Sequence, residues 1–352
     1  MAAMKKTYAL APCILLALSL AILTNFISNN LSSRFFHQAE TVQSQYRMLA
    51  GQPTLIDGVP TVFPQFYNRV LFPALFWMVA RLGILRDTQS YLLTRLLSAV
   101  ALFLAFLLVV RRAFRPDFRI AVAGAGLLAY VYLFTFNHGW EITSDYFDGI
   151  FTCLFILLAL ERRHVALLAV AILASFNRES SVFAGVIWFA LYGINRKRSI
   201  EWRESFYAAL VCVTAYASAI GIRVAILGSR QTFGSDAQAV ITPSWWWRQE
   251  VLPFFQHPNA SGWPVLAFAM VAPILWWIGI NREYMGEKQT RLFAAGCVIG
   301  AITCAFGHSE ELRVFIPALT VLVFTCVWLE VLRSQSGING TELSRDKQLA
   351  PL

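Results

Sequence analysis

The sequence predicts an all-α polytopic membrane protein. Hydrophobic residues make up 57% of its 352 residues and charged residues only 14%, and the mean hydropathy is +0.57. Apolar runs of about 20 residues, the length that crosses ~30 Å of hydrocarbon, recur along the chain. Basic residues gather in alternate connections between these runs, as the positive-inside rule requires. We therefore expect a single transmembrane domain over residues 1–333 and a short cytoplasmic tail over 334–352.

Composition also limits the partners and cofactors. The net charge of +9 is explained by basic residues kept in cytoplasmic connections, so no nucleic-acid partner is expected. The six cysteines all lie within apolar runs and show neither metal-ligand spacing nor a disulfide framework. No metal ligands are predicted, and a divalent metal stays open as a cofactor.

The first predicted span covers residues 8–27 and follows Lys5 and Lys6. The run is long for a signal peptide and no small-residue cleavage site follows it, so we expect an uncleaved helix with a cytoplasmic N-terminus. Nine further spans are expected over residues 91–110, 120–136, 147–160, 165–177, 181–194, 205–227, 263–281, 290–306 and 312–332. This arrangement of about ten spans puts both termini in the cytoplasm. It leaves residues 28–90, 137–146, 178–180, 228–262 and 307–311 outside, the loops at 28–90 and 228–262 being the large ones.

Residues 69–85 are the ambiguous segment. They are apolar enough for an eleventh span, which would invert every later connection. The run is short, however, contains Pro73 and is bounded by Arg69, Arg81 and Arg86. We favour a helix that lies in the outer membrane interface with its apolar face in lipid.

The rest of the first external loop predicts an amphipathic helix near 33–50 and a Gly/Pro-rich connector. A series of motifs begins in this loop with Ala-Glu-Thr-x-x-x-Gln-Tyr-Arg-Met-Leu-Ala-Gly (39–51), Tyr-Asn-Arg-x-x-x-Pro (67–73) and Gly83. It continues into the next predicted span with Arg-Leu-Leu-Ser-Ala (95–99). This series resembles the front end of the GT-C membrane glycosyltransferases, most of all aminoarabinose transferases and protein O-mannosyltransferases. The likeness covers roughly residues 8–110. The chain departs from that pattern by having a single acid instead of an acidic pair, no Lys-Pro-Pro-Leu and no soluble C-terminal domain.

The resemblance implies a GT-C-like fold and a defined chemistry. A polyprenyl-phosphate-linked sugar would be the donor at the external membrane face, and a glycan or lipid would be the acceptor. Glu40 occupies the acidic position of the family and is therefore a candidate general base. The resemblance and the chain length favour a bacterial inner membrane.

Further candidates lie in the connections expected outside. Asp145 and Asp148 are acids near the membrane boundary and are candidate bases, although Ser144 or Asp145 also fits a simple helix cap. Arg178 and Glu179 either meet the donor or pair with neighbouring helices to fix the bundle. Arginine is favoured for phosphate because its planar fork matches phosphate oxygens. The full set of substrate-binding candidates is Arg69, Arg178, Glu179, Glu310, Glu311, Arg313 and Trp246, the last from a tryptophan run that also fits an aromatic belt.

Two other functional classes remain open. A transporter or flippase would line a permeation path with these charges, and a non-catalytic subunit of an envelope polysaccharide system would use them to bind a partner. A transporter usually needs polar groups near the bilayer midplane, whereas the charges placed here cluster at external ends of spans. A membrane glycosyltransferase is therefore the leading hypothesis.

Overall fold

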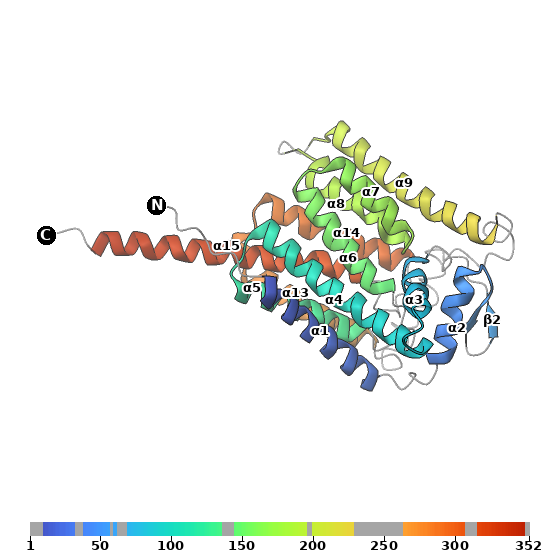
Figure 1. Cartoon of the computed structure of the whole chain (residues 1–352). Coiled ribbons are helices and arrows are strands. Elements are labelled where there is room, and N and C mark those ends of the chain that lie inside the picture. The colour runs from blue at the N-terminus through green and yellow to red at the C-terminus, as the bar shows by residue number, and fades with distance from the viewer. Residues whose placement is uncertain are drawn as a thin grey trace.

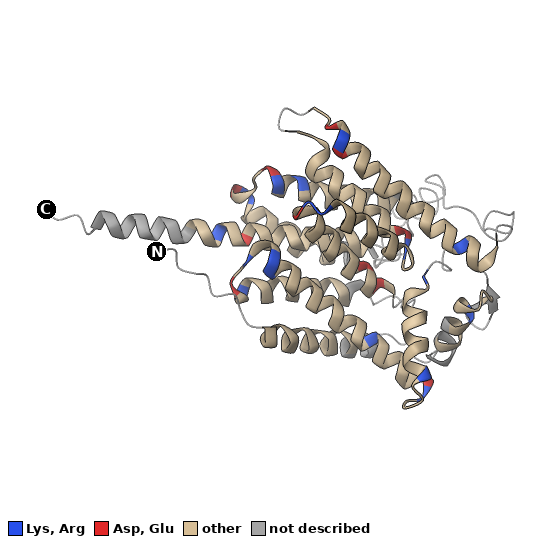
Figure 2. Ribbon diagram, turned by 45° about the horizontal axis from the view of Figure 1, so that its top comes forward, with Lys and Arg blue, Asp and Glu red and all other residues tan. Residues whose placement is uncertain are grey.

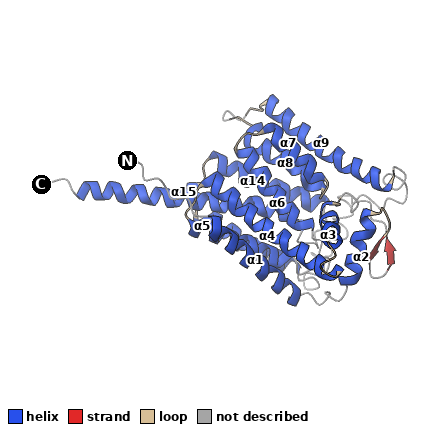
Figure 3. Ribbon diagram, viewed as in Figure 1, coloured by secondary structure: helices blue, strands red, loops and turns tan. Residues whose placement is uncertain are grey.

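The protein is a helical bundle with one small sheet (Figures 1 and 3). The structure, a computed structural model, describes residues 10–31, 38–56, 59–61, 69–135, 144–195, 199–228, 263–306 and 315–348. The first helix, α1 (Leu10–Leu31), begins at the same end of the bundle from which the last helix, α15 (Ile316–Gln348), projects (Figure 1). We call this the terminal end and the opposite end the far end.

Each predicted span is matched by a helical segment. Besides α1 and α15 these are α4 (Asp87–Phe114), α5 (Phe118–Thr135), α6 (Ser144–Leu160), α7 (His164–Ser175), α9 (Trp202–Leu227), α13 (Trp263–Ile280) and α14 (Glu287–Phe306). The segment expected at 181–194 is a broken helix, made of a 3-10 turn η3 (Glu179–Val182), α8 (Phe183–Trp188) and a π-helical turn η4 (Phe189–Gly193).

Three of the described helices are long and apolar enough to cross a membrane: α4, α9 and the Ile316–Ser336 part of α15. The expected count of about ten spans is therefore not supported. The apolar stretches of several other helices are shorter, and α7, with 12 residues, reaches only ~18 Å of the ~30 Å that hydrocarbon requires. Apolar runs in a sequence do not show where a helix begins, breaks or turns, so by themselves they do not establish which helices span.

The core lies where α4, α5 and α6 pack around α15. Phe106 of α4 meets Phe324 of α15 with ring centroids 4.9 Å apart, and Phe114 stacks on Trp328 at 5.1 Å. In the apolar stretch of α15, 78% of the residues are buried inside the protein. In the apolar stretch of α9, only 17% are buried. Thus α15 is central, and α9 stands at the edge of the bundle (Figure 1).

Ion pairs and hydrogen bonds connect helices at the terminal end. Glu161, just after α6, pairs with Arg112 of α4 and with Arg163, whose Nε lies 2.8 Å from its carboxylate. Glu204 of α9 accepts a hydrogen bond from Trp188 at 2.9 Å. Figure 2 shows several Lys and Arg positions at this end of the bundle. Beyond Arg333, where a short tail was expected, α15 continues as a helix to Gln348.

The far end carries the expected first external loop. The amphipathic helix predicted near 33–50 is α2 (Gln38–Leu49), and the interfacial helix predicted at 69–85 is α3 (Leu71–Arg81). With 11 residues, α3 is only ~16 Å long, about half of a span. The connector between them contains an unexpected hairpin of β1 (Thr54–Ile56) and β2 (Val59–Thr61). The Asp-Gly pair at 57–58 is a strong hairpin signal, but it was not used to predict one.

Candidate functional site

Five charged side chains of the described residues are almost inaccessible to solvent: Arg69, Arg95, Asp145, Asp148 and Arg178. Their positions share one property. Arg69 precedes α3, Arg95 lies in the first third of α4, and the two aspartates open α6. Arg178 follows α7 in the turn that leads to η3. All five therefore belong to the far end of the bundle. Buried charge is costly unless it is paired, so this concentration indicates a structural or functional task.

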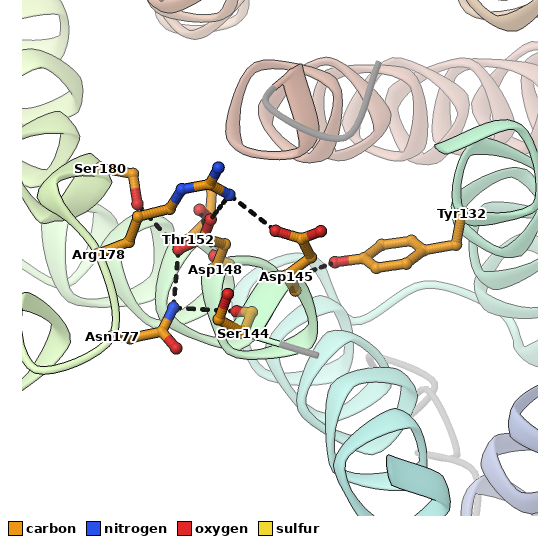
Figure 4. Close-up of polar contacts among 8 residues, drawn as sticks. All are labelled: Tyr132, Ser144, Asp145, Asp148, Thr152, Asn177, Arg178 and Ser180. Atoms are coloured by element: carbon orange, nitrogen blue, oxygen red, sulfur yellow. Dashed lines mark hydrogen bonds and ion pairs between the residues drawn. The ribbon is translucent and has the colours of Figure 1, made fainter. Parts of the chain in front are cut away.

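The two buried aspartates, Asp145 and Asp148, share Arg178 as their ion-pair partner (Figure 4). Nη1 of Arg178 donates to Oδ1 of Asp145 at 2.7 Å and to Oδ2 of Asp148 at 2.9 Å. The aspartates are three residues apart, which places both carboxylates on one face of α6. They also lie in its first turns, where the helix dipole favours negative charge. The sequence thus places two acids at the start of one helix and their cation at the end of the next.

Neutral side chains complete the environment of Asp148. Its Oδ1 accepts hydrogen bonds from Nδ2 of Asn177 and from the hydroxyl of Ser180, both at 2.8 Å. Asn177 also donates to the carbonyl oxygen of Ser144 at 3.0 Å. Asp148 therefore receives three side-chain donors, counting Arg178. We call Asp145, Asp148, Asn177, Arg178 and Ser180 the acid–arginine cluster.

A tyrosine from α5 supports the backbone of Asp145. The hydroxyl of Tyr132 donates to the Asp145 carbonyl oxygen at 3.1 Å (Figure 4). The Tyr132 ring stacks on Tyr146, with centroids 5.8 Å apart and planes 2° from parallel. Gly149 makes room for this contact, because a Cβ at that position would overlap the Tyr132 hydroxyl and lie 2.6 Å from Leu102. The first turn of α6 is therefore fixed by packing as well as by charge.

A second ion pair lies beside the cluster. Glu179, next to Arg178, pairs with Arg223 near the end of α9. That end of α9 also touches the turn after α2, since a Cβ on Gly51 would lie 2.8 Å from the Ile226 carbonyl oxygen. Gly51 has φ +65°, a conformation that favours glycine. The η3 turn is thus connected to α9, and α9 to the loop after α2.

The surface helix α3 begins on the same turn. The backbone N–H groups of Val70 and Leu71 donate to the carbonyl oxygen of Phe176, at 2.9 and 3.2 Å. Phe176 directly precedes Asn177 and Arg178. Two N–H groups at the start of α3, which no helical carbonyl can satisfy, therefore find their partner in the turn that carries the cluster.

The structure brings together some of the predicted site residues. Asp145, Asp148 and Arg178 form the cluster, with Glu179 and the buried Arg69 in the segments that adjoin it. Glu40 lies in α2, but its side chain is outside the described part of the structure. The other predicted residues, Trp246, Glu310, Glu311 and Arg313, fall outside the described residues.

Sequence reasoning missed five residues of this region: Arg95, Tyr132, Asn177, Ser180 and Arg223. Arg95 and Arg223 carried a signal, because an arginine inside an apolar run indicates a pairing or functional role. Asn177 and Ser180 flank Arg178 and Glu179 in one short turn, so the turn itself was the clue. Nothing in the local sequence of Tyr132 distinguishes it from other aromatic residues in spans.

No group of three or more His, Cys, Asp and Glu side chains suited to a metal ion occurs among the described residues. The cluster itself presents two carboxylates that a guanidinium, an amide and a hydroxyl hold in place. Searches against protein-family models, characterised proteins and solved structures find no match to this chain.

Proposed function

We propose that the protein is a membrane glycosyltransferase of the GT-C type. It takes a polyprenyl-phosphate-linked sugar at the external membrane face and transfers the sugar to a glycan or lipid. The motif series over residues 39–99 and the helices of membrane-crossing length support this proposal. The observation that carries it is the gathering of the buried charged side chains at the far end.

The one-sided placement of charge favours a transferase over a transporter. A lipid-linked donor presents its phosphate at one membrane face, so the groups that act on it belong at that face. A transporter usually binds its substrate near the bilayer midplane. In the described part of the chain, the buried aspartates and arginines occupy the start of α6, the turn after α7 and the adjoining segments. This distribution matches the requirement of a transferase.

The proposed reaction is a displacement at the anomeric carbon of the donor. The acceptor hydroxyl oxygen forms a bond to that carbon as the bond from the carbon to the phosphate oxygen breaks. The electron pair leaves with the polyprenyl phosphate, and the acceptor proton passes to a carboxylate. Asp145 and Asp148 are the candidates whose surroundings are described, and Glu40 is the candidate that the resemblance supplies.

Of the two aspartates, we rank Asp145 first as the base. Asp148 accepts hydrogen bonds from Asn177, Arg178 and Ser180, so both of its carboxylate oxygens are already engaged by neighbouring side chains. It is better suited to anchor Arg178. Proton uptake by Asp145 would remove one of the two negative charges that face Arg178. The guanidinium would then stabilise the developing charge on the phosphate leaving group.

The proposal includes a topology of about ten crossings, with both termini in the cytoplasm of a bacterial inner membrane. Successive helices run in opposite directions, and the connections after α4, α6 and η4 lie at the terminal end with their basic residues. That pattern supports a cytoplasmic terminal end under the positive-inside rule. The acid–arginine cluster would then be external.

Turnover of a lipid-linked sugar tests the function. The purified protein in nanodiscs is given a panel of polyprenyl-phosphate sugars, and the release of polyprenyl phosphate is measured. Asp145→Asn is expected to lose ~10²–10⁴-fold in turnover with donor binding retained. Asp148→Asn and Glu40→Gln rank the other two candidates. Asp117→Asn, which changes an exposed acid after α4, is the matched control. Normal turnover in all three site variants would reject carboxylate catalysis.

One observation favours a second candidate function. Arg178 is neutralised by both aspartates, and a purely structural tie between α6 and α7 would have the same contacts. This is what a non-catalytic subunit of an envelope polysaccharide system would show. Such a subunit would release no polyprenyl phosphate with any donor, and Asp145→Asn would lower its thermal stability alone.

A further inference from the structure

Helix α3 has two apolar faces. Phe72, Pro73 and Phe76 are buried, and the Phe76 ring lies 5.0 Å from Tyr46 and 6.0 Å from Tyr91. This inner face attaches α3 to α2 and α4. The opposite face is open, and it continues into the turn that follows the helix.

The residues on this open face are apolar but strongly exposed to solvent. Leu82 is 68% and Ile84 is 80% exposed. The surface also includes Trp77, Met78, Arg81 and Leu85, and we call these six residues the α3 surface. Trp77, Met78, Arg81 and Leu82 are spaced at i, i+1, i+4 and i+5, so they share one helical face. A contiguous apolar patch of this kind indicates a surface that meets another apolar phase.

The position of α3 identifies that phase. Only residues 82–86 separate the end of α3 from the start of α4, which is long and apolar enough to cross a membrane. The α3 surface must therefore lie close to the membrane face at which α4 begins. There the axis of α3 runs across the direction that α4, α6 and α9 share (Figure 1). Gly83, with φ +67°, ends the helix and lets the chain turn toward α4.

The charges on this surface point to anionic lipid. The Arg81 guanidinium lies over the Trp77 ring, 4.6 Å from its centroid, an arrangement of cation and indole that suits the headgroup level. Arg86 is exposed in the turn beside it. The nearby acid, Asp87, is engaged by Tyr46, and burial together with this carboxylate raises the pKa of the Tyr46 hydroxyl. Asp87 is itself exposed, so the exposed charge beside the patch is two arginines against one aspartate, a net positive charge.

We propose that the α3 surface docks into the headgroup and acyl boundary of an anionic phospholipid membrane and thereby holds the acid–arginine cluster in place. The link is the pair of hydrogen bonds from Val70 and Leu71 to the Phe176 carbonyl oxygen. The start of α3 is bonded to the residue before Asn177 and Arg178, and its far side enters the lipid. Loss of lipid contact would release the turn that presents Arg178 to the two aspartates. This docking does not depend on glycosyl transfer.

Photocrosslinking tests the identity of the occupant. A benzophenone amino acid replaces Ile84 in the full chain, which is reconstituted in phosphatidylcholine vesicles with and without phosphatidylglycerol. We expect crosslinks to phospholipid, with phosphatidylglycerol enriched about fivefold over its bulk share and the enrichment lost in R81Q/R86Q. The same probe at Phe72, on the inner face, should crosslink to the protein itself. Crosslinks from Ile84 to a second copy, or none to lipid, would overturn the proposal.

Hydrogen exchange tests the link to the cluster. In the same vesicles, Leu82→Ser with Ile84→Ser should speed amide exchange at residues 70–71 and 177–180 severalfold. The control is Leu210→Ser, on the exposed side of α9, which should leave both segments unchanged. Unchanged exchange in the α3 variant, with lipid crosslinking retained, would separate the two parts of the proposal and reject the second. Neither readout uses turnover, so failure here is distinct from failure of the proposed enzymatic function.

Discussion

Asn177 joins the side chain of Asp148 to the backbone of Ser144, through hydrogen bonds of 2.8 and 3.0 Å. Asn177→Ala removes both donors and leaves buried acceptors short of a partner. We expect the free energy of unfolding to fall by about 1–3 kcal/mol, measured by thermal or denaturant unfolding in detergent. Asn195→Ala, at an exposed turn, should cost less. Equal losses in the two variants would mean that burial of the cluster contributes nothing.

Gly149 allows Tyr132 to reach the first turn of α6. Gly149→Ala would place a methyl group against the Tyr132 hydroxyl and 2.6 Å from Leu102. We expect a loss of about 1–3 kcal/mol, the usual cost of overpacking a core. Gly126→Ala in α5 is the matched control, because a Cβ there meets nothing within 4 Å. It should be neutral or stabilising by up to about 1 kcal/mol. The prediction is wrong if both variants unfold alike.

Glu179 and Arg223 connect η3 to α9, and both side chains are largely withdrawn from solvent. Removal of one partner leaves the other charge poorly solvated. We therefore expect Glu179→Gln and Arg223→Gln to be non-additive, with a coupling free energy of about 0.5–3 kcal/mol in a double-mutant cycle. The charge-reversed pair Glu179→Arg with Arg223→Glu should recover part of the loss. Additive single variants would show that the contact contributes little.

At the scale of the helices, Glu161 follows α6 and pairs with Arg112 of α4 and with Arg163, which precedes α7. These ion pairs join the three helices at the terminal end. The hydrogen bond from Arg112, assisted by the charges of Arg112 and Arg163, holds the pKa of the Glu161 carboxyl below its usual range. A depressed carboxyl pKa gives stability that is present above the unfolded pKa of ~4.3 and is lost as pH falls through the folded value. Both arginines are more than half exposed, so the contribution stays below about 1 kcal/mol.

The measurement is the melting temperature between pH 7 and pH 3 in detergent. The wild type should lose slightly more stability on acidification than Glu161→Gln does, and the difference should shrink with added salt. Glu283→Gln, an acid of the turn after α13 for which the structure gives no ion pair among its described contacts, serves as the comparison. A wild type and Glu161→Gln variant with parallel pH profiles would contradict the prediction.

The sequence predicted the position of the helices better than their role as spans. Apolar runs marked α4 and α9 to within a few residues at each end, since burial and lipid contact both demand them. The break of the segment at 179–193 into η3, α8 and η4 was not visible, because the segment contains no proline that would signal it. The β1–β2 hairpin was missed although Asp-Gly at 57–58 signalled it.

The candidate site was predictable only in part. Asp145, Asp148 and Arg178 were singled out because charge near a membrane boundary is costly, and the structure places them in contact. Their neighbours Tyr132 and Asn177 are ordinary residues in sequence, and tertiary packing alone gives them their partners. No pattern within one segment could show that α5, α6 and the turn after α7 converge.

At the scale of the whole molecule, charged side chains lie at both ends of the bundle, but their exposure to solvent differs. At the terminal end, the arginines of the Glu161 contact are exposed and can be solvated. At the far end, the charged side chains of the acid–arginine cluster are buried and satisfied by one another. Exposed basic residues orient a polytopic protein, whereas buried pairs are retained for structure or chemistry. The same bundle therefore separates the groups that set its orientation from those that we propose do its chemistry.

Orientation is the last prediction. We expect the terminal end in the cytoplasm and the far end outside. In a background with Cys297→Ser, which removes the exposed native thiol, single cysteines replace Gln52 at the far end, outside the α3 surface, and Asp117 at the terminal end, both exposed. A membrane-impermeant maleimide should label the first in intact cells and the second only after permeabilisation, because basic residues keep their connections inside. The reverse labelling would place the acid–arginine cluster in the cytoplasm, where a polyprenyl-phosphate sugar on the outer face is out of reach, and the proposed function would fail with it.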